Sequence, residues 1–508
     1  MASHGSDADA AGPASRLERG LTAFLALVVL ASLFWSVHPW YDATNDGSMY
    51  IATARALAAG EGYTYNETPF LIRPPGFSCL LAPLLAWRGT DFFALNLFVS
   101  LWGALGVFLF QRWARARLGA VLATAAALLL WFNPGYQRLC TQVMSDVPGW
   151  TLLVASFLLA RSVARRPTLA RFAALGLVLG LASLVRSGNL LFLPALVAAF
   201  AARELFGGAT RLGVRACAGH VLALVCGCAL VLAPWSLRNR LVAAPPPADQ
   251  TLLYSYGSGM WHADMGDPNS PRVTWSEVLG RLPKQGKKLL WTLGERLGEG
   301  AGSARTPWIA GAMLLALVVA LLRHRAAEEV LAFATLAVVA FYFGYAGRLL
   351  LPVFALAVVA VLELVRDGCG RAFGTRVGAG LALLLALAWL GLDFRPRAGW
   401  SEIEALHTAF ARNAEQVKKN LAPDARLGAY RGWDHAVYLE RDVFNLENAV
   451  RREGLALAVP ALIEKYRLDT LLLTPLGLPE SVAREERAFA AEVVRRHGGR
   501  ELGLVRVR

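Results

Sequence analysis

Residues 21–37 read LTAFLALVVLASLFWSV, an apolar run without a single charged side chain. A helix needs about 17–25 such residues to cross the hydrocarbon core of a bilayer. No small-residue cleavage site follows, so the run is read as a membrane helix and not as a signal peptide. Ten further apolar runs follow it, at 90–111, 119–133, 147–160, 172–185, 189–202, 218–235, 308–322, 330–344, 349–365 and 377–392. The series predicts a mostly α polytopic membrane protein with about eleven transmembrane helices.

The composition of the 508-residue chain agrees with this class. The chain is 56% hydrophobic and 17% charged, whereas soluble domains are about 25% charged. These values exclude an ordinary soluble enzyme, a disordered chain and a disulfide-stapled module. The formal net charge is +14, which raises nucleic acid as a partner until the positions of the arginines are considered.

Most of the basic residues lie in alternate connections between the apolar runs. Five connections hold fifteen arginines, and the alternate short ones carry one each, namely Arg138, Arg186 and Arg348. Arginine-rich connections stay in the cytoplasm. The pattern therefore predicts a plasma (inner) membrane protein with a cytoplasmic tail at 1–20 and a transmembrane domain at 21–392. Two long segments, 38–89 and 236–306, are then outside, and the basic surplus faces membrane lipids and not nucleic acid.

The character of the chain changes after Leu392. Residues 397–508 alternate between helical and extended patterns, which predicts a small α/β domain. The expected helices are 400–420, 433–440, 456–466 and 482–497, and the expected strands are 426–430, 443–446, 469–474 and 501–507. On the predicted topology this domain is extracytoplasmic.

Polar residues gather on the predicted outer face in a fixed order. Asp46 and Tyr50 follow the first run, Gly62-Tyr63 follows a short helix, and Arg73-Pro74-Pro75-Gly76 forms a rigid turn. Ser145-Asp146-Val147-Pro148 then opens a later run. Taken singly, Asp46 and Asp146 are also explained as residues that cap helix N-termini.

Together these motifs resemble the GT-C membrane glycosyltransferases, in particular the group of protein O-mannosyltransferases and the aminoarabinose transferase (glycosyltransferase family 39-like). The resemblance covers roughly residues 17–360. It implies a GT-C fold and transfer of a sugar from a polyprenyl-phosphate donor to an acceptor on the extracytoplasmic face. The sequence departs from the family where a second acidic residue often follows the first, because that place is Gly47.

This chemistry suggests roles for individual side chains. An acceptor hydroxyl must lose its proton, and Asp46 is the predicted general base, with Asp146 orienting it or binding sugar hydroxyls. The lipid phosphate that leaves needs cations near the outer interface. The candidates for these cations are Arg73, Arg138, Arg186, Arg238 and Arg348. Pairing with carboxylates or anionic headgroups is the alternative explanation for these arginines.

Other residues are weaker candidates. Tyr50, Tyr63, Trp261 and His262 could contact the substrate, although the stretch from Tyr254 to Asp264 also reads as an ordinary surface loop. His262 with Asp264 and Asp267 is a poor metal pattern because the spacing fits no helix or strand. No metal site is predicted and no cofactor is firmly implied.

One further motif lies in the C-terminal domain. Trp433-Asp434 there resembles half of an oligosaccharyltransferase signature, but reads better as the start of a helix with Asp434 in its first turn.

Two other functions compete with the glycosyltransferase. A transporter or flippase for a lipid-linked sugar would show inverted repeats and ionisable groups near the midplane of the membrane, and neither is clear in the sequence. A scaffold that presents the C-terminal domain would leave Asp46, Arg73 and Asp146 unexplained. The expected partners are a polyprenyl-phosphate sugar donor, membrane lipids and a lipid, glycan or protein acceptor.

Overall fold

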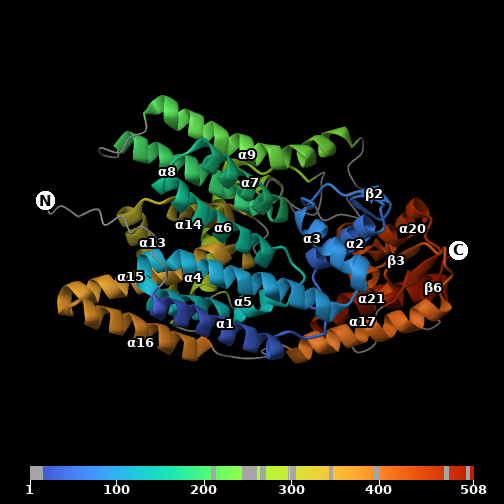
Figure 1. Ribbon diagram of the computed structural model, residues 1–508. Helices are drawn as coiled ribbons and strands as arrows, with labels where there is room; N and C mark the ends of the chain where they lie inside the picture. The colour runs from blue at the N-terminus through green and yellow to red at the C-terminus, as the bar shows by residue number, and fades with distance from the viewer. Residues whose placement is uncertain are drawn as a thin grey trace.

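A computed structural model describes residues 15–206, 213–242, 260–263, 270–295, 297, 305–342, 347–393, 400–473, 480–498 and 504–507. Every predicted apolar run falls largely on a helix. These helices are α1 (Arg16–Ser36), α4 (Phe92–Trp131), α6 (Asp146–Arg165), α7 (Leu169–Val185), α8 (Phe192–Phe206), α9 (Val214–Leu241), α13 (Thr306–His324), α14 (Ala327–Phe341), α15 (Leu351–Phe373) and α16 (Thr375–Asp393). They pack side by side into one bundle (Figure 1).

Helix α4 contains two of the predicted runs. Gly119 interrupts it with a φ of 77°, a left-handed conformation that glycine adopts without steric cost. The chain folds back at this point, and Gln111 Nε2 on one side of the break donates a hydrogen bond of 3.0 Å to Thr124 Oγ1 on the other. The arginines at 112–117 therefore lie at a turn between two apolar segments, as predicted.

The bundle carries an apolar outer surface. Phe34 on α1, Leu230 on α9 and Leu384 on α16 are 91%, 69% and 63% exposed. Leaving such side chains in water would cost about 1.5–3 kcal/mol each. Within the described residues, seven helices are long and apolar enough to cross a membrane, and they are α1, α4, α6, α9, α13, α15 with the 3-10 turn η2 (Gly347–Leu350) before it, and α16. The chain is therefore a multi-pass membrane protein.

Shorter elements gather at one end of the bundle, beside the C-terminal domain (Figure 1). They come from the predicted outer segment 38–89 and from the connection before α6. They are α2 (Asn45–Ala58), β1 (Thr64–Tyr65), β2 (Thr68–Pro69), α3 (Gly76–Arg88) and α5 (Pro134–Cys140). Elsewhere, α11 (Trp275–Gly280) and α12 (Leu282–Gly294) belong to the second predicted outer segment, and η1 (Ser187–Leu191) joins α7 to α8.

The C-terminal region is a small α/β layer. Its elements are α17 (Trp400–Asn420), β3 (Leu427–Ala429), α18 (Gly432–Leu439), β4 (Phe444–Asn445), α19 (Glu447–Glu453), α20 (Leu455–Tyr466), β5 (Thr470–Leu472), α21 (Glu480–His497) and β6 (Leu504–Arg506). The strand order is β4-β3-β5-β6, and only the β5–β6 pair is antiparallel. Within the described residues of this region, each of the eight predicted elements has a counterpart, and α19 was not predicted from the sequence.

The sheet packs against the membrane bundle and not only against its own helices. Leu427, Val437 and Leu472 belong to the same continuous hydrophobic core as the buried residues of the bundle. A separate core that includes Leu446 and Leu468 serves the rest of the domain. The C-terminal region therefore shares one core with the bundle and has a second core of its own, and the division of the chain near residue 397 stays a prediction.

Candidate functional site

The first turn of α2 presents Asp46 toward the bundle. The N-cap of this helix is Thr44, whose side-chain oxygen accepts a hydrogen bond of 3.0 Å from the Gly47 amide. Asp46 is thus inside the helix, and the alternative interpretation of Asp46 as the N-cap is wrong. Because Thr44 satisfies the helix end, the carboxylate of Asp46 is available for other partners.

Two arginines from distant parts of the chain hold that carboxylate. Arg73 Nη2 lies 3.1 Å from Asp46 Oδ1, and Arg348 pairs with Asp46 Oδ2. Arg348 also places its Nε 3.8 Å from Asp146 Oδ1, and Arg186 Nη1 is 2.8 Å from the same oxygen. These five residues are called the Asp46 cluster below. Three predicted phosphate-binding arginines and both predicted catalytic carboxylates therefore meet in one place.

The charges of the cluster control the protonation of Asp46. Burial alone would raise the pKa of its carboxyl group, but the nearby guanidinium groups of Arg73 and Arg348 outweigh burial and lower that pKa to about 2. Burial also works against the charged form of Arg73, and the neighbouring Asp46 carboxylate outweighs it and raises the pKa of Arg73. Asp46 is therefore ionised at neutral pH. With three arginines and two carboxylates, the cluster is positively charged.

Gly47 is closely packed. A Cβ atom there would lie 2.7 Å from Thr44 Oγ1, 2.9 Å from the Tyr41 hydroxyl and 3.0 Å from the Val143 carbonyl oxygen. These distances leave no room for a side chain. A second acidic residue at this position would require Thr44 and Tyr41 to shift.

The turn that carries Arg73 also packs closely against a neighbouring segment. A Cβ on Gly76 would come within 2.6 Å of the Leu184 carbonyl oxygen, at the end of α7. Arg186, two residues after Leu184, is the C-cap of α7. Gly76 therefore allows the Arg73 turn and the Arg186 position to dock against each other.

Tyr50 and Tyr63 pack beside the Asp46 cluster and contact residues next to it. The Tyr50 hydroxyl hydrogen-bonds to Ser145 Oγ at 3.0 Å, next to Asp146, and burial raises the pKa of Tyr50. The Tyr63 hydroxyl donates to the Arg73 carbonyl oxygen at 3.1 Å. Both side chains are almost fully buried. Their contacts position Asp146 and the Arg73 turn, so a direct role in substrate contact stays a prediction.

Arg138 and Arg238 are not brought to the cluster. Arg138 Nε pairs with Asp42 Oδ2 at 3.1 Å. Arg238 donates to the carbonyl oxygens of Tyr63, at 2.7 Å, and Phe70, at 2.9 Å. Arg238 thus braces the β1–β2 hairpin, and it also donates to Asn239 Oδ1 at 3.2 Å and lies over the Tyr63 and Trp235 rings.

Trp261 and His262 also have local contacts in the described structure. Trp261 packs edge-on against Trp275 with ring centroids 4.6 Å apart, and a ring nitrogen of His262 lies 3.1 Å from the Ser270 carbonyl oxygen. Asp264, Asp267 and residues 254–259 lie outside the described residues. Within the described residues, no group of three His, Cys, Asp or Glu side chains could hold a metal ion.

The C-terminal domain reaches the cluster through a contact that sequence reasoning missed. Asp434 lies in the first turn of α18, as predicted, and is fully buried. It accepts hydrogen bonds from Ser48 Oγ at 3.1 Å and from Arg431 Nε at 2.7 Å. Ser48 is two residues beyond Asp46 and also contacts the Tyr41 hydroxyl at 2.8 Å. The C-terminal domain therefore holds the helix that carries Asp46.

Known proteins share parts of this architecture. Residues 72–235 match the family model described as dolichyl-phosphate-mannose-protein mannosyltransferase. No curated protein sequence matches the chain. The crystal structure of ArnT from Cupriavidus metallidurans in the apo state superposes with a TM-score of 0.55 at 16% identity, covering 96% of this chain and 98% of that one.

Two lipid-bound structures are also similar. ArnT from Cupriavidus metallidurans bound to undecaprenyl phosphate gives a TM-score of 0.52 at 16% identity, over 84% of this chain and 85% of that one. The oligosaccharyltransferase AglB from Archaeoglobus fulgidus, in complex with an inhibitory peptide and a dolichol-phosphate, gives 0.52 at 13% identity, over 90% and 69%. At these identities the likeness establishes the fold, and the chain has the GT-C fold that its motifs predicted.

Proposed function

We propose that the protein is a membrane glycosyltransferase that moves a sugar from a polyprenyl-phosphate donor to an acceptor hydroxyl on the extracytoplasmic face. The observation that carries this proposal is Arg348, which contacts Asp46 and lies 3.8 Å from Asp146. One cation thus joins a candidate base to a second carboxylate. The lipid phosphates bound by the structurally similar ArnT and AglB support the choice of donor class.

The proposed reaction needs one base and several cations. The acceptor oxygen attacks the anomeric carbon, the bond from that carbon to the phosphate oxygen breaks, and the polyprenyl phosphate leaves with the electron pair. The acceptor proton passes to the Asp46 carboxylate. Arg73, Arg186 and Arg348 stabilise the charge that develops on the phosphate.

The resting cluster is poorly suited to take a proton, because a carboxyl group with a pKa of about 2 is a weak base. Donor binding changes this balance. A phosphate that draws Arg73 and Arg348 toward itself removes cations from Asp46, and the loss of a nearby opposite charge raises a carboxyl pKa. In the proposed mechanism the donor therefore activates the base.

The proposed orientation puts the Asp46 cluster and the C-terminal domain on the extracytoplasmic side of the membrane. Both lie at the same end of the bundle, joined by the Ser48–Asp434 hydrogen bond. The arginine-rich connections predicted to be cytoplasmic lie at the other end of α6 and α15. A donor whose lipid tail stays in the bilayer then presents its phosphate to Arg73 and Arg348.

The direct test is transfer by purified protein in lipid with a panel of radiolabelled polyprenyl-phosphate sugars. For Asp46→Asn we expect transfer or slow hydrolysis of the active donor to fall by about 10²–10⁴-fold, as for other lost general bases. The matched control is Asp42→Asn, because Asp42 is also buried and paired with an arginine, Arg138. The control should keep its activity.

Two results would contradict the proposal. Full activity of Asp46→Asn would exclude Asp46 as the base. Inertness of the wild-type protein toward every donor, with normal membrane insertion, would favour the transporter or flippase.

A further inference from the structure

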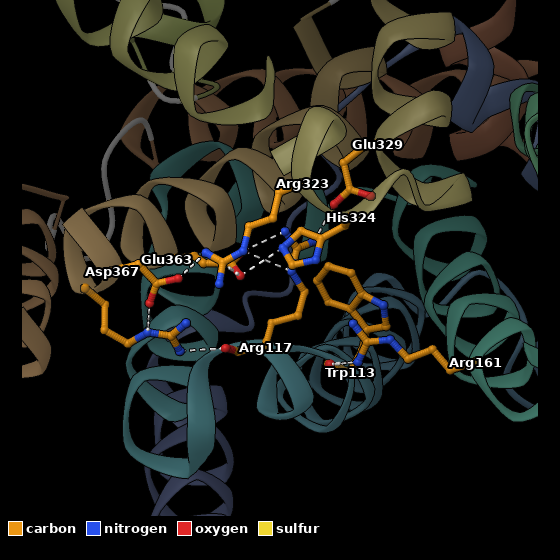
Figure 2. Close-up of polar contacts among 9 residues, drawn as sticks. Trp113, Arg117, Arg161, Arg323, His324, Glu329, Glu363 and Asp367 are labelled. Carbon is orange, nitrogen blue, oxygen red and sulfur yellow. Dashed lines mark hydrogen bonds and ion pairs between the residues drawn. The ribbon is translucent and has the colours of Figure 1, made fainter. Parts of the chain in front are cut away.

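A second group of charged residues lies at the end of the bundle opposite the Asp46 cluster. Arg117 pairs with Glu329 on α14 and places its Nη2 2.7 Å from Glu363 Oε2 on α15. His324 Nε2 lies 2.9 Å from Glu363 Oε1, and Arg323 pairs with Asp367. Figure 2 shows these side chains pointing toward one another from α4, α13, α14 and α15. They are called the Glu363 cluster below.

A cavity of about 440 Å³ opens beside this cluster. Its lining is strongly basic, with five arginines, one histidine and a single carboxylate: Arg117, Arg161, Arg165, Arg323, Arg366, His324 and Glu363, together with Ala116 and Ala164. The carboxylate is already occupied, because Arg117, Arg323 and His324 all contact it. Asp367 likewise pairs with Arg323 and Arg366. The acidic groups therefore compensate one side of the cavity.

The other wall carries two arginines on α6, Arg161 and Arg165. Within the part of the chain that the structure describes, neither Arg161 nor Arg165 has a carboxylate oxygen at ion-pair distance. Arg161 is held in place, since its guanidinium lies 4.7 Å from the Trp113 ring centroid and donates to the Trp113 carbonyl oxygen. Trp113 is itself buried and donates to Glu328 Oε1 at 3.0 Å. Arg161 is thus oriented before any ligand arrives, while Arg165 is exposed at the rim.

The cavity lies where apolar helix segments end. Arg117 precedes the break at Gly119, Arg165 is the last residue of α6, and Arg323 is in the last turn of α13. This is the depth at which a helix leaves the hydrocarbon for the headgroup region of the bilayer. On the predicted topology it is the cytoplasmic leaflet, whose surface is anionic.

We propose that this cavity binds a phosphate group, held by Arg161 and Arg165, and that the source is the headgroup of an anionic membrane lipid. Guanidinium groups are matched to phosphate oxygens in charge and geometry. Basic pockets between membrane helices on the cytoplasmic side bind such headgroups. The site is separate from the Asp46 cluster and does not depend on the proposed glycosyltransferase activity.

The test compares the full-length protein in phosphatidylcholine nanodiscs with increasing fractions of phosphatidylglycerol. Lipid retention by native mass spectrometry and the thermal unfolding midpoint are measured for the wild type and for Arg161→Gln/Arg165→Gln. The matched control is Arg112→Gln/Arg166→Gln, because both residues are exposed on the same predicted face outside the cavity. At about 1 kcal/mol per arginine, or about fivefold in affinity, the cavity variant should bind phosphatidylglycerol about 30-fold more weakly.

A second arm separates the two sources of phosphate. It uses phosphatidylcholine nanodiscs with inorganic phosphate added to the buffer. Retention and stabilisation by phosphatidylglycerol in the wild type and the control, lost in the cavity variant, would support the proposal. Equal stabilisation by inorganic phosphate alone, lost in the same variant, would overturn the lipid as the source. Retention that is equal in the cavity variant and the control would overturn the site.

Discussion

The Asp46 cluster lies at one end of α6 and α15, and the Glu363 cluster with its cavity lies at the other end, and the two sites differ in how their charges are paired. Helix α6 begins at Asp146 and ends at Arg165, while α15 follows Arg348 and contains Glu363. The side chains of the Asp46 cluster come from helix starts and turns. Those of the Glu363 cluster come from the first turn of α14, the last turn of α13 and the interiors of α4 and α15. The Asp46 cluster has three arginines for two carboxylates, whereas the Glu363 cluster has two arginines and one histidine for three carboxylates.

The position of each arginine relative to the predicted topology sharpens this contrast. Arg186 and Arg348 stand alone in connections where arginine is disfavoured, and the structure gives both of them a carboxylate partner in the Asp46 cluster. Arg117 and Arg323 belong to arginine-rich connections. The comparison shows that ordinary topological arginines can also be built into a specific, partly buried site.

The largest effect on stability is expected for Arg117→Leu, which tests whether the Glu363 cluster is structural. Arg117, Glu329 and Glu363 have side chains that are 8%, 1% and 6% exposed. Removing the arginine leaves the Glu329 carboxylate without its ion pair, and a broken buried pair costs about 3–5 kcal/mol of stability. Equilibrium unfolding in mixed micelles measures this loss. We expect the Glu363 cluster to be primarily structural by this criterion.

The double variant Arg117→Leu/Glu329→Leu is the matched control. Replacing both partners of a buried pair by apolar residues is often neutral or stabilising, so the double variant should regain most of the lost stability. Equal stability of the single and double variants would show that Arg117 does not compensate Glu329.

The sequence predicted the two clusters unequally, and the reason is physical. Short motifs and apolar periodicity are local signals that a sequence shows directly. They predict the apolar runs, the elements of the C-terminal domain and the motifs that contain Asp46, Arg73 and Asp146. Arg138 and Arg238 were predicted beside the same phosphate, yet they contact Asp42 and the backbone of the β1–β2 hairpin. The choice between neighbouring carbonyl and carboxylate partners depends on three-dimensional packing.

Contacts between distant parts of the chain were beyond sequence reasoning. The Ser48–Asp434 bond joins residues 386 positions apart, and Arg117–Glu363 joins residues 246 apart. No periodic pattern encodes such pairs. The excess of arginine near 112–117 and 161–171 indicates topology. The acidic residues Glu328, Glu329 and Glu363, in or beside apolar runs, are the sequence signal for a site.

A smaller effect is expected from Asp434→Asn, which tests whether the Asp46 cluster depends on the C-terminal domain. The substitution keeps the shape of the side chain but removes the charge that accepts hydrogen bonds from Ser48 and Arg431. Loss of hydrogen bonds to a charged group costs about 1.5–3 kcal/mol. We expect lower stability together with a slower transfer rate, because α2 is less well positioned.

Ser48→Ala separates the two consequences. It removes the bond from α2 to Asp434, together with the Ser48–Tyr41 hydroxyl contact, and leaves the Arg431–Asp434 pair intact. Stability should fall by about 0.5–1.5 kcal/mol for each hydrogen bond lost. Under the positioning hypothesis the transfer rate still falls in this variant with KM nearly unchanged. Normal kcat in both variants would show that the contact serves folding alone.

The smallest effect expected is in the pH dependence of transfer, which sharpens the role of charge at the Asp46 cluster. A base works only when deprotonated, so activity falls as the pH drops below its pKa. In the free protein, Arg73 and Arg348 lower the pKa of Asp46 to about 2. The profile of kcat/KM, which reports the free enzyme, should therefore show no acidic limb from Asp46 above about pH 3. The profile of kcat reports the donor complex, where a phosphate that draws the arginines away raises this pKa. An acidic limb should then appear at higher pH in kcat than in kcat/KM, and Asp42→Asn should leave both profiles unchanged.

An acidic limb at the same pH in both profiles would mean that the donor does not activate Asp46. The two clusters would then differ in composition but not in how a ligand changes their charge.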